Sequence, residues 1–244
     1  MNDYWKNRAK LYDNLEWVHN KKWLSDLIEF SDIQESDKVL DLGCGTGVVT
    51  KGVSPLCQSV IAMDVCQEMV DEVPESDNIY KMVNDIETNA PFKNHFDKII
   101  SRMCFHHLTN DTNQAFKNCK SMLMDGGSLI ITESIPPTPD KDVVNWWTEM
   151  FALKEDRLVF TLADLYKFFV VHGFSNIQIK EIVTKKFSVN NWVCNQGLSE
   201  ERQKQIKDMH RNAPQYVKEV QNIEELNGHI TLDSKSIIIK GVKG

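Results

Sequence analysis

The chain of 244 residues is long enough to bury one sizeable core, and its hydrophobic share of 41% and charged share of 26% are typical of a soluble globular protein. Its net charge of −7 argues against a surface built mainly to hold nucleic acid or anionic lipid. We therefore expect no nucleic-acid partner.

The six cysteines are scattered along the chain, and none of them forms a C-x-x-C pair. The first residues are polar, and no apolar run approaches the ~20 residues that are needed to cross a bilayer. These features predict reduced thiols, a cytoplasmic protein without a membrane span, and no metal site.

Residues 3–30 carry the apolar spacing of amphipathic helices and are dense in aromatic side chains. Two interpretations stay open for them. The helices can simply pack on a larger body, or they can form a lid whose aromatic side chains close over a ligand, and both can hold at once. We take residues 1–35 as an N-terminal helical lid.

From residue 37 onward, short apolar runs alternate with helical patterns. Such an alternation predicts a parallel sheet that is covered on both faces, with the carboxyl ends of its strands along one edge. Residues 36–135 are therefore expected to form the core of the fold. The expected strands are 38–42, 59–63, 79–83, 97–102 and 128–132, and the expected helices are about 47–55, 66–72 and 113–124, the last one stopped by Gly126 and Gly127.

After residue 134 the character of the sequence changes, because three prolines make a rigid connection. Residues 136–244 are expected to complete the sheet and to add helical cap insertions. The expected elements are helices over 140–153 and 162–171, a strand over 176–183, a polar helical segment over 190–226 and a last strand over 236–242.

A glycine-rich loop follows the first expected strand, with the sequence Asp41-Leu42-Gly43-Cys44-Gly45-Thr46-Gly47. Glycine lets the backbone turn sharply and lets a ligand approach at the carboxyl end of a strand. Val48 stands where a dinucleotide-binding loop would have its third glycine. The acid ahead of the loop suits a cationic amine better than a pyrophosphate.

Two further acids follow the next two expected strands. Asp64 lies beyond Gly43 at about the 20-residue offset at which a carboxylate meets the hydroxyls of a ribose. It can instead cap the helix that follows it. Asp85 can accept a hydrogen bond from an adenine amino group, or it can be an ordinary turn residue.

This set of motifs resembles the class I S-adenosylmethionine-dependent methyltransferases, and within them it is similar to the ubiquinone/menaquinone-biosynthesis-type branch of small-molecule methyltransferases. The resemblance covers residues 36–134 well. It rests on the glycine loop at 41–47, on Asp64, on Asn84-Asp85-Ile86, and on the segment 101–108 with Phe105-His106-His107-Leu108.

The resemblance implies a doubly wound, Rossmann-like α/β fold. Its sheet would have seven strands, with the last strand antiparallel and inserted beside its neighbour. A helical cap would come from the N-terminal helices and from insertions after strands 5 and 6.

The resemblance also implies S-adenosylmethionine as the cofactor, with two groups of contacts. At the methionine end, Asp41 would orient the amino group of the cofactor, and the backbone near Arg102 would meet the same amine. Arg8 and Tyr12 would lie over the methionine end of the cofactor. Gly43, Cys44 and Gly45 would line the methionine part.

At the adenosine end, the resemblance places Asp64 on the ribose hydroxyls. Val65 and Met69 would pack against the adenine ring. Asp85 and Ile86 would address the edge of the adenine.

We expect an enzyme that transfers the methyl group to a small-molecule acceptor, with His106 and His107 as candidate catalytic bases. A histidine of this motif can instead only shape the pocket. The N-P-P-Y-type tetrapeptide of amino-methylating enzymes is absent, because residues 101–104 read Ser-Arg-Met-Cys. An RNA or protein methyltransferase and a non-catalytic S-adenosylmethionine-binding protein remain alternatives, and a homodimer stays open.

Overall fold

The computed structural model describes residues 2–244, apart from the side chains of residues 2–4 and 7. Five parallel strands form its first half, as the sequence predicts. They are β1 (Lys38–Leu42), β2 (Ser59–Asp64), β3 (Ile79–Val83), β4 (Phe96–Arg102) and β5 (Leu123–Ser134). The elements between them are α3 (Val48–Val53), η1 (Ser54–Leu56), α4 (Gln67–Asp71), η2 (Phe105–His107) and α5 (Thr112–Met122).

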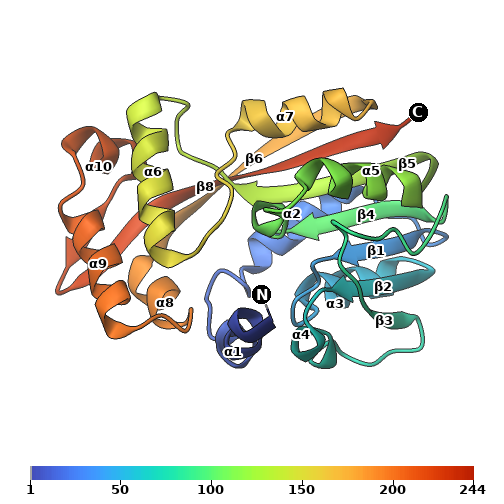
Figure 1. Cartoon of the computed structure of the whole chain (residues 1–244), viewed down its shortest axis with the longest axis horizontal. Coiled ribbons are helices and arrows are strands. Elements are labelled where there is room, and N and C mark those ends of the chain that lie inside the picture. Colours follow the sequence, from blue (N-terminus) through green and yellow to red (C-terminus); the bar gives the residue numbers. More distant parts are fainter. Residues whose placement is uncertain (1) are drawn as a thin grey trace.

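The second half of the chain completes the sheet with long antiparallel strands. β8 (His229–Lys243) lies between β5 and β6 (Phe174–Ser188), so that the strand order is β3-β2-β1-β4-β5-β8-β6. The consecutive Ile237, Ile238 and Ile239 are all fully buried, because β8 is covered on both faces. The expected antiparallel last strand beside its neighbour is therefore confirmed (Figure 1).

An eighth strand was not expected from the sequence. β7 (Glu224–Leu226) pairs with the start of β8, where the segment over 190–226 was predicted to be helical. Asn227 and Gly228 join the two strands with positive φ angles of 50° and 78°. This Asn-Gly pair is a strong signal for a hairpin turn, and the sequence interpretation overlooked it.

The end of α5 also differs from the prediction. The helix ends at Met122, ahead of Gly126 and Gly127, and Leu123 already belongs to β5. Leu123 is fully buried and pairs with Phe96 of β4. Tertiary pairing therefore ends the helix, and the two glycines lie inside the strand.

The remaining helices stand around the sheet. They are α1 (Asn2–Tyr12), α2 (Lys21–Ser31), α6 (Lys141–Lys154), α7 (Leu162–Val171), α8 (Val189–Cys194), α9 (Glu200–Arg211) and α10 (Gln215–Gln221). The expected N-cap of α7 is confirmed, because the Thr161 hydroxyl accepts a hydrogen bond from the Asp164 amide at 3.2 Å. None of the helices within residues 2–244 is both long and apolar enough to cross a membrane.

Four of these helices, α6, α8, α9 and α10, gather at one end of β6 and β8 and form what we call the helical cap (Figure 1). The cap has an apolar core of its own, which includes Trp146, Trp147, Phe151, Trp192 and Ile206. In Figure 1, α1 lies between the cap and the strands β1–β4. The expected cap insertions after the fifth and sixth strands are thus confirmed.

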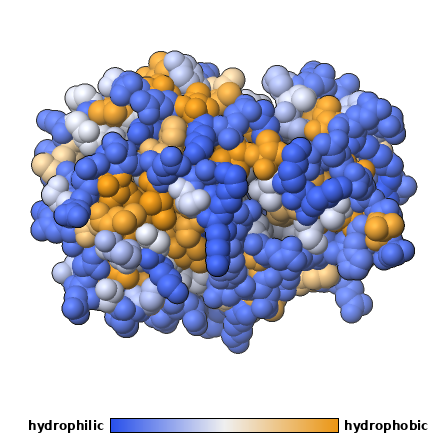
Figure 2. Space-filling model, turned by 180° about the vertical axis from the view of Figure 1, so that it is seen from behind, coloured by the Kyte–Doolittle hydropathy of each residue, from blue (hydrophilic) through white to orange (hydrophobic). Residues whose placement is uncertain are grey.

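The surface mixes both kinds of side chain. On the face opposite to that of Figure 1, apolar patches lie among hydrophilic side chains (Figure 2). β6 lies at an edge of the sheet, and its Ile179 and Val183 are 39% and 48% exposed. A homodimer stays a prediction.

Candidate active site

The glycine loop turns tightly between β1 and α3. Gly43 and Gly45 have φ angles of +69° and +53°, which L side chains rarely adopt. A Cβ on Gly43 would stand 2.4 Å from the Sγ of Cys104. The amides of Gly43 and Cys44 donate to the Met63 carbonyl at 2.8 Å and 3.0 Å, and they fix the loop on the end of β2.

A cavity opens above this loop, at the carboxyl ends of β1–β4, and we call it the glycine-loop cavity. Most residues that the sequence assigns to the cofactor line it. These are Tyr12, Gly43, Gly45, Asp64, Val65, Met69, Asp85, Ile86 and Arg102. The structure therefore brings together residues that are spread over some 90 positions of the sequence, because the parallel strands end at one edge.

Asp64 stands on the wall of the glycine-loop cavity with its carboxylate already oriented. Its Oδ2 accepts a hydrogen bond from the Gly45 amide, and its Oδ1 accepts one from the Cys66 amide, both at 3.0 Å. Burial raises the pKa of Asp64, and these amides oppose the shift. Each oxygen keeps a second lone pair, so the carboxylate can accept two neighbouring hydroxyls.

Three of the predicted cofactor residues do not line this cavity. Asp41 is buried beneath the loop, where it accepts a hydrogen bond from the Thr50 hydroxyl at 2.6 Å and where burial raises its pKa to about 6. The Cys44 side chain packs in a buried cluster with Ala62. Arg8 lines a different cavity, which is described below.

Tyr12 and Arg102 form the side of the glycine-loop cavity that faces the N-terminal helices. The Tyr12 ring lies 3.5 Å from the position that a Cβ of Gly45 would take, so that α1 covers the loop. Arg102 donates to the carbonyl of Val18 at 3.0 Å, and its guanidinium lies 5.4 Å from the Trp17 ring. The N-terminal helices are therefore tied to the end of β4.

A second cavity, the cap cavity, lies between α1, the strand ends of β5, β6 and β8, and the helical cap. Its walls are mainly apolar and aromatic, and they include Trp147, Met150, Phe151, Phe187 and Trp192. Polar and charged side chains interrupt these walls, among them Arg8, His106, Ser134, Lys154, Arg157, Thr184, His210, Gln221 and Ser236.

The two cavities share a wall. Trp5, Tyr12, Met103 and His107 line both of them. Met103 has a φ of +55°, a strained conformation for a residue with a side chain, and such strain clusters at functional sites. The Trp5 ring meets His107 edge-on, with the ring centres 4.5 Å apart.

His106 is held by a buried carboxylate at this junction. Its Nδ1 lies 2.6 Å from Oε2 of Glu133, and its backbone amide donates to Oε1 at 3.2 Å. Burial raises the pKa of Glu133 to about 7 and holds the pKa of His106 well below its usual range. The carboxylate fixes the tautomer with Nδ1 protonated, so Nε2 carries the lone pair.

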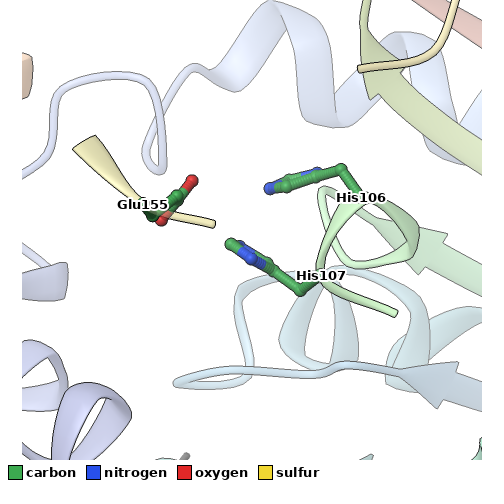
Figure 3. A group of neighbouring side chains, drawn as sticks. All are labelled: His106, His107 and Glu155. Carbon is green, nitrogen blue, oxygen red and sulfur yellow. The ribbon is translucent and has the colours of Figure 1, made fainter. Parts of the chain in front are cut away.

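His107 and Glu155 complete a small group with His106, and the three side chains face one another (Figure 3). One ligand atom from each of them lies within 4.8 Å of the others. Burial lowers the pKa of His107 too. This geometry makes the group a candidate metal site. The charges around the group determine whether a metal ion would be stable there.

Three cations surround the Glu155 carboxylate. Arg8 lies at 3.1 Å, Lys154 at 2.5 Å and Arg157 at 3.6 Å from its oxygens. Burial alone would raise the pKa of Glu155, but Lys154, His107, Arg8 and Arg157 together hold it well below its usual range. A metal ion would meet these like charges at short range, so the surroundings disfavour one. The absence of a metal stays a prediction, and this charge argument supports it.

Several residues of the site were missed by the sequence interpretation. Glu133 was expected at the edge where the strands end, together with Asp41, Asp64, Asp85 and Arg102, but it was given no role of its own. Lys154, Glu155 and Arg157 received none either, because a run of charges after a helix usually reads as a solvated surface. The strained Met103 lies next to Arg102, and only the backbone geometry marks it.

Comparison with known proteins identifies the central part of the chain. Residues 40–131 match a family model described as "Methyltransferase domain". The uncharacterized methyltransferase C1347.09 of Schizosaccharomyces pombe is 29% identical over 40% of this chain and 38% of its own length. The first three curated relatives are matched over 38%, 27% and 50% of their lengths.

Longer matches have lower identity. The uncharacterized methyltransferase YcgJ of Bacillus subtilis is 22% identical over 97% of this chain and 99% of its own length. The crystal structure of YcgJ has a TM-score of 0.79, and the match covers 90% of this chain and 97% of the YcgJ chain. Phosphoethanolamine N-methyltransferase 2 of Haemonchus contortus, solved with phosphomonomethylethanolamine and S-adenosylhomocysteine, has a TM-score of 0.65 at 15% identity and matches 96% of this chain and 56% of its own.

The solved structures share the fold of this chain. The sheet order with an antiparallel strand next to the edge is the Rossmann-like fold that these neighbours share. Residues 40–131 match the model of a methyltransferase domain, and two of the neighbours with this fold were solved with S-adenosylhomocysteine or S-adenosylmethionine.

Proposed function

We propose that this chain transfers a methyl group from S-adenosylmethionine to a small-molecule acceptor that binds in the cap cavity. One observation carries the proposal. The glycine-loop cavity and the cap cavity adjoin at Trp5, Tyr12, Met103 and His107, so ligands in the two cavities would meet at this shared wall.

The residues of the glycine-loop cavity suit the cofactor. The left-handed Gly43 and Gly45 leave room next to the Tyr12 ring, where a methionine chain would lie. Asp64 would accept the ribose hydroxyls. Val65 and Met69 would pack on the adenine ring, with Asp85 and Ile86 at its edge.

At the methionine end, only some of the residues that the sequence predicts line the glycine-loop cavity. Arg102 lines the glycine-loop cavity, whereas Asp41, Cys44 and Arg8 do not. We infer that Asp41 acts from beneath the loop through Thr50, that Cys44 contributes its backbone alone, and that Arg8 belongs to the acceptor side.

The bound cofactor supplies a methyl group on a positively charged sulfur, and the chain holds the two reactants in register. Holding reactants in such geometry is worth up to ~7–11 kcal/mol of the barrier. Where the acceptor atom carries a proton, Nε2 of His106 would take it, and Glu133 would stabilise the resulting imidazolium through Nδ1. His107, which lines both cavities, is the second candidate for this role.

Two features favour a small acceptor. The walls of the cap cavity include Trp147, Met150 and Phe151, each less than a tenth exposed, so these walls belong to the apolar core of the cap. The net charge of −7 does not suit a phosphate backbone. The resemblance to the ubiquinone/menaquinone-type branch and the cytoplasmic location stay predictions.

The three segments expected from the sequence fit this proposal as working parts. Residues 1–35 would act as the lid, since Trp5 and Tyr12 line both cavities. Residues 36–135 would hold the cofactor. Residues 136–244 would hold the acceptor.

The test is to incubate the protein with methyl-labelled S-adenosylmethionine and cell extract, and to separate the products by size. We expect label in small metabolites, and we expect His106→Ala to abolish it. Label in RNA or protein would contradict the small-molecule acceptor. Binding of S-adenosylhomocysteine in calorimetry without any label transfer would indicate a binding protein instead.

A further inference from the structure

The cap cavity has a polar end that neither the cofactor nor the proton transfer uses. Gln221, the last residue of α10, and His210, near the end of α9, both line the cavity there. They are 2% and 1% exposed. In Figure 1, α9 and α10 lie at the end of the molecule that is farthest from β1–β3.

The orientation of the Gln221 amide follows from its partner. The indole Nε1 of Trp147 lies 3.1 Å from Oε1 of Gln221. An indole N–H can only donate, so the atom that faces it must be the amide oxygen, and the other atom is the NH₂ group.

Within the part of the chain that the structure describes, that NH₂ group has no hydrogen-bond partner. Among the residues that the structure describes, no acceptor lies within hydrogen-bond distance of Nε2 of Gln221, although the atom is buried. Buried amide N–H groups in native proteins nearly always have an acceptor, because leaving one unpaired is costly. The lining position of Gln221 indicates that the missing acceptor comes with a ligand.

His210 lines the cap cavity together with Gln221 and carries no charge at neutral pH. The Nδ1 of His210 donates to the Ile206 carbonyl at 2.7 Å, and burial lowers the pKa of His210 to about 4, so the ring is neutral at pH 7. The strands β5, β6 and β8 add only hydroxyl groups to the polar lining, those of Ser134, Thr184, Ser234 and Ser236. The cations that line the cavity, Arg8, Lys154 and Arg157, surround the Glu155 carboxylate beside His106 and His107, so a neutral acceptor oxygen suits Gln221 better than an anion.

We infer that the ligand of the cap cavity is a neutral, mostly apolar molecule with a carbonyl oxygen that accepts a hydrogen bond from Nε2 of Gln221, at the end away from the methylated atom. Trp147, Phe151 and Trp192 would pack on its body. This inference rests on the proposed function, since it names the chemistry of the methyl acceptor.

The experiment compares two probes that differ in one group. 2-Acetylnaphthalene carries a carbonyl where 2-ethylnaphthalene carries a methylene. Each is titrated by calorimetry into the full chain in the presence of S-adenosylhomocysteine. We expect the ketone to bind about five- to tenfold more tightly, as one hydrogen bond to a buried donor provides.

Variants then assign the preference to Gln221. Gln221→Met keeps the length of the side chain but removes both N–H groups, so the ratio of the two affinities should fall to about one. Trp147→Phe leaves Gln221 in place but removes the indole N–H that orients it, so the ratio should fall as well. Gln215→Met is the matched control, because Gln215 is an exposed residue of the same helix, and it should keep the wild-type ratio.

Three outcomes would overturn the inference: equal binding of the two probes to the wild type, an unchanged ratio in Gln221→Met, or no binding of either probe. If S-adenosylhomocysteine still binds in those cases, the proposed function stands. Failure of S-adenosylhomocysteine to bind would sink the proposed function, and the ratio measured without it would still decide this inference.

Discussion

The two cavities of this chain are built in different ways. The glycine-loop cavity takes its residues from the ends of consecutive parallel strands, where backbone amides hold the functional groups, as the amides of Gly45 and Cys66 hold Asp64. The cap cavity takes its residues from α1, α6, β6, β8 and the small helices, and its polar groups are held by other side chains, as Glu133 holds His106.

This difference separates what is general from what is particular to the chain. A backbone cradle on a common fold can serve many proteins with one cofactor. A cavity built from side chains of inserted helices can change with each acceptor. We therefore expect changes in the glycine-loop cavity to alter cofactor affinity, and changes in the cap cavity to alter turnover or acceptor choice.

The largest effect is expected at the junction. His106→Ala removes the proposed base. Turnover, measured with the fraction of the cell extract that takes up label, should therefore fall by about 10²–10⁴-fold. The affinity for S-adenosylhomocysteine should stay within about twofold, because His106 does not line the glycine-loop cavity. His229→Ala, at an exposed position, is the control. Unchanged turnover in His106→Ala would refute the role of this base.

The next effect concerns the stability of the cap. The pKa of His210 is about 4 in the folded chain and about 6.5 in the unfolded chain, so the unfolded chain binds more protons between these values. The stabilisation is fully present above pH 6.5 and is lost as the pH falls toward 4, with a total of about 3 kcal/mol.

His210→Asn removes this titration but keeps a donor for the Ile206 carbonyl. Its free energy of unfolding should therefore fall less than that of the wild type between pH 7 and pH 4. Chemical denaturation at both pH values measures the difference. Equal slopes for the two proteins would show that His210 titrates normally in the folded cap.

Substitutions in the glycine-loop cavity should change only the affinity for the cofactor. Asp64→Asn replaces a carboxylate that would accept the ribose hydroxyls, and the dissociation constant of S-adenosylhomocysteine should rise by about 10–100-fold, since hydrogen bonds to charged groups are worth ~1.5–3 kcal/mol. Asp71→Asn, at an exposed position on α4, is the control. Equal affinities in the two variants would exclude Asp64 from the ribose site.

The smallest effect is expected in a pH profile. Because burial raises the pKa of Glu133 to about 7, the proposed base loses its carboxylate partner as the pH falls through 7. The value of kcat/KM should thus rise with pH through about 7 in the wild type. Glu133→Gln should remove this rise and lower the plateau about tenfold. A variant that retains the rise would assign it to another group.

The sequence was sufficient for the parts that local pattern determines. The glycines from Asp41 to Gly47 predicted the tight turn after β1, and the run from Ile237 to Ile239 predicted the last strand. The predicted end of α5 was wrong, because Leu123 belongs to the sheet through its pairing with Phe96. Such a tertiary contact leaves no local mark.

The polar groups of the cap cavity could not be predicted for the same reason. The role of Gln221 follows from its hydrogen bond with the Trp147 indole, which is 74 positions away in the sequence. The role of Glu133 follows from its contact with His106, which is 27 positions away. Neither spacing is a recurrent motif. From the sequence, Trp147, Phe151 and Trp192 can form an apolar cap over the methyl group or only bury the extra helices on the sheet, and how four helices meet determines which of them share a cavity.

The account depends first on the glycine-loop cavity binding its cofactor. Calorimetric titration of S-adenosylhomocysteine into the wild-type chain tests this directly. We predict one site per chain with a dissociation constant in the micromolar range, on the order of 1–100 μM. The absence of binding heat at several temperatures, with a folded protein in the cell, would contradict the central claim.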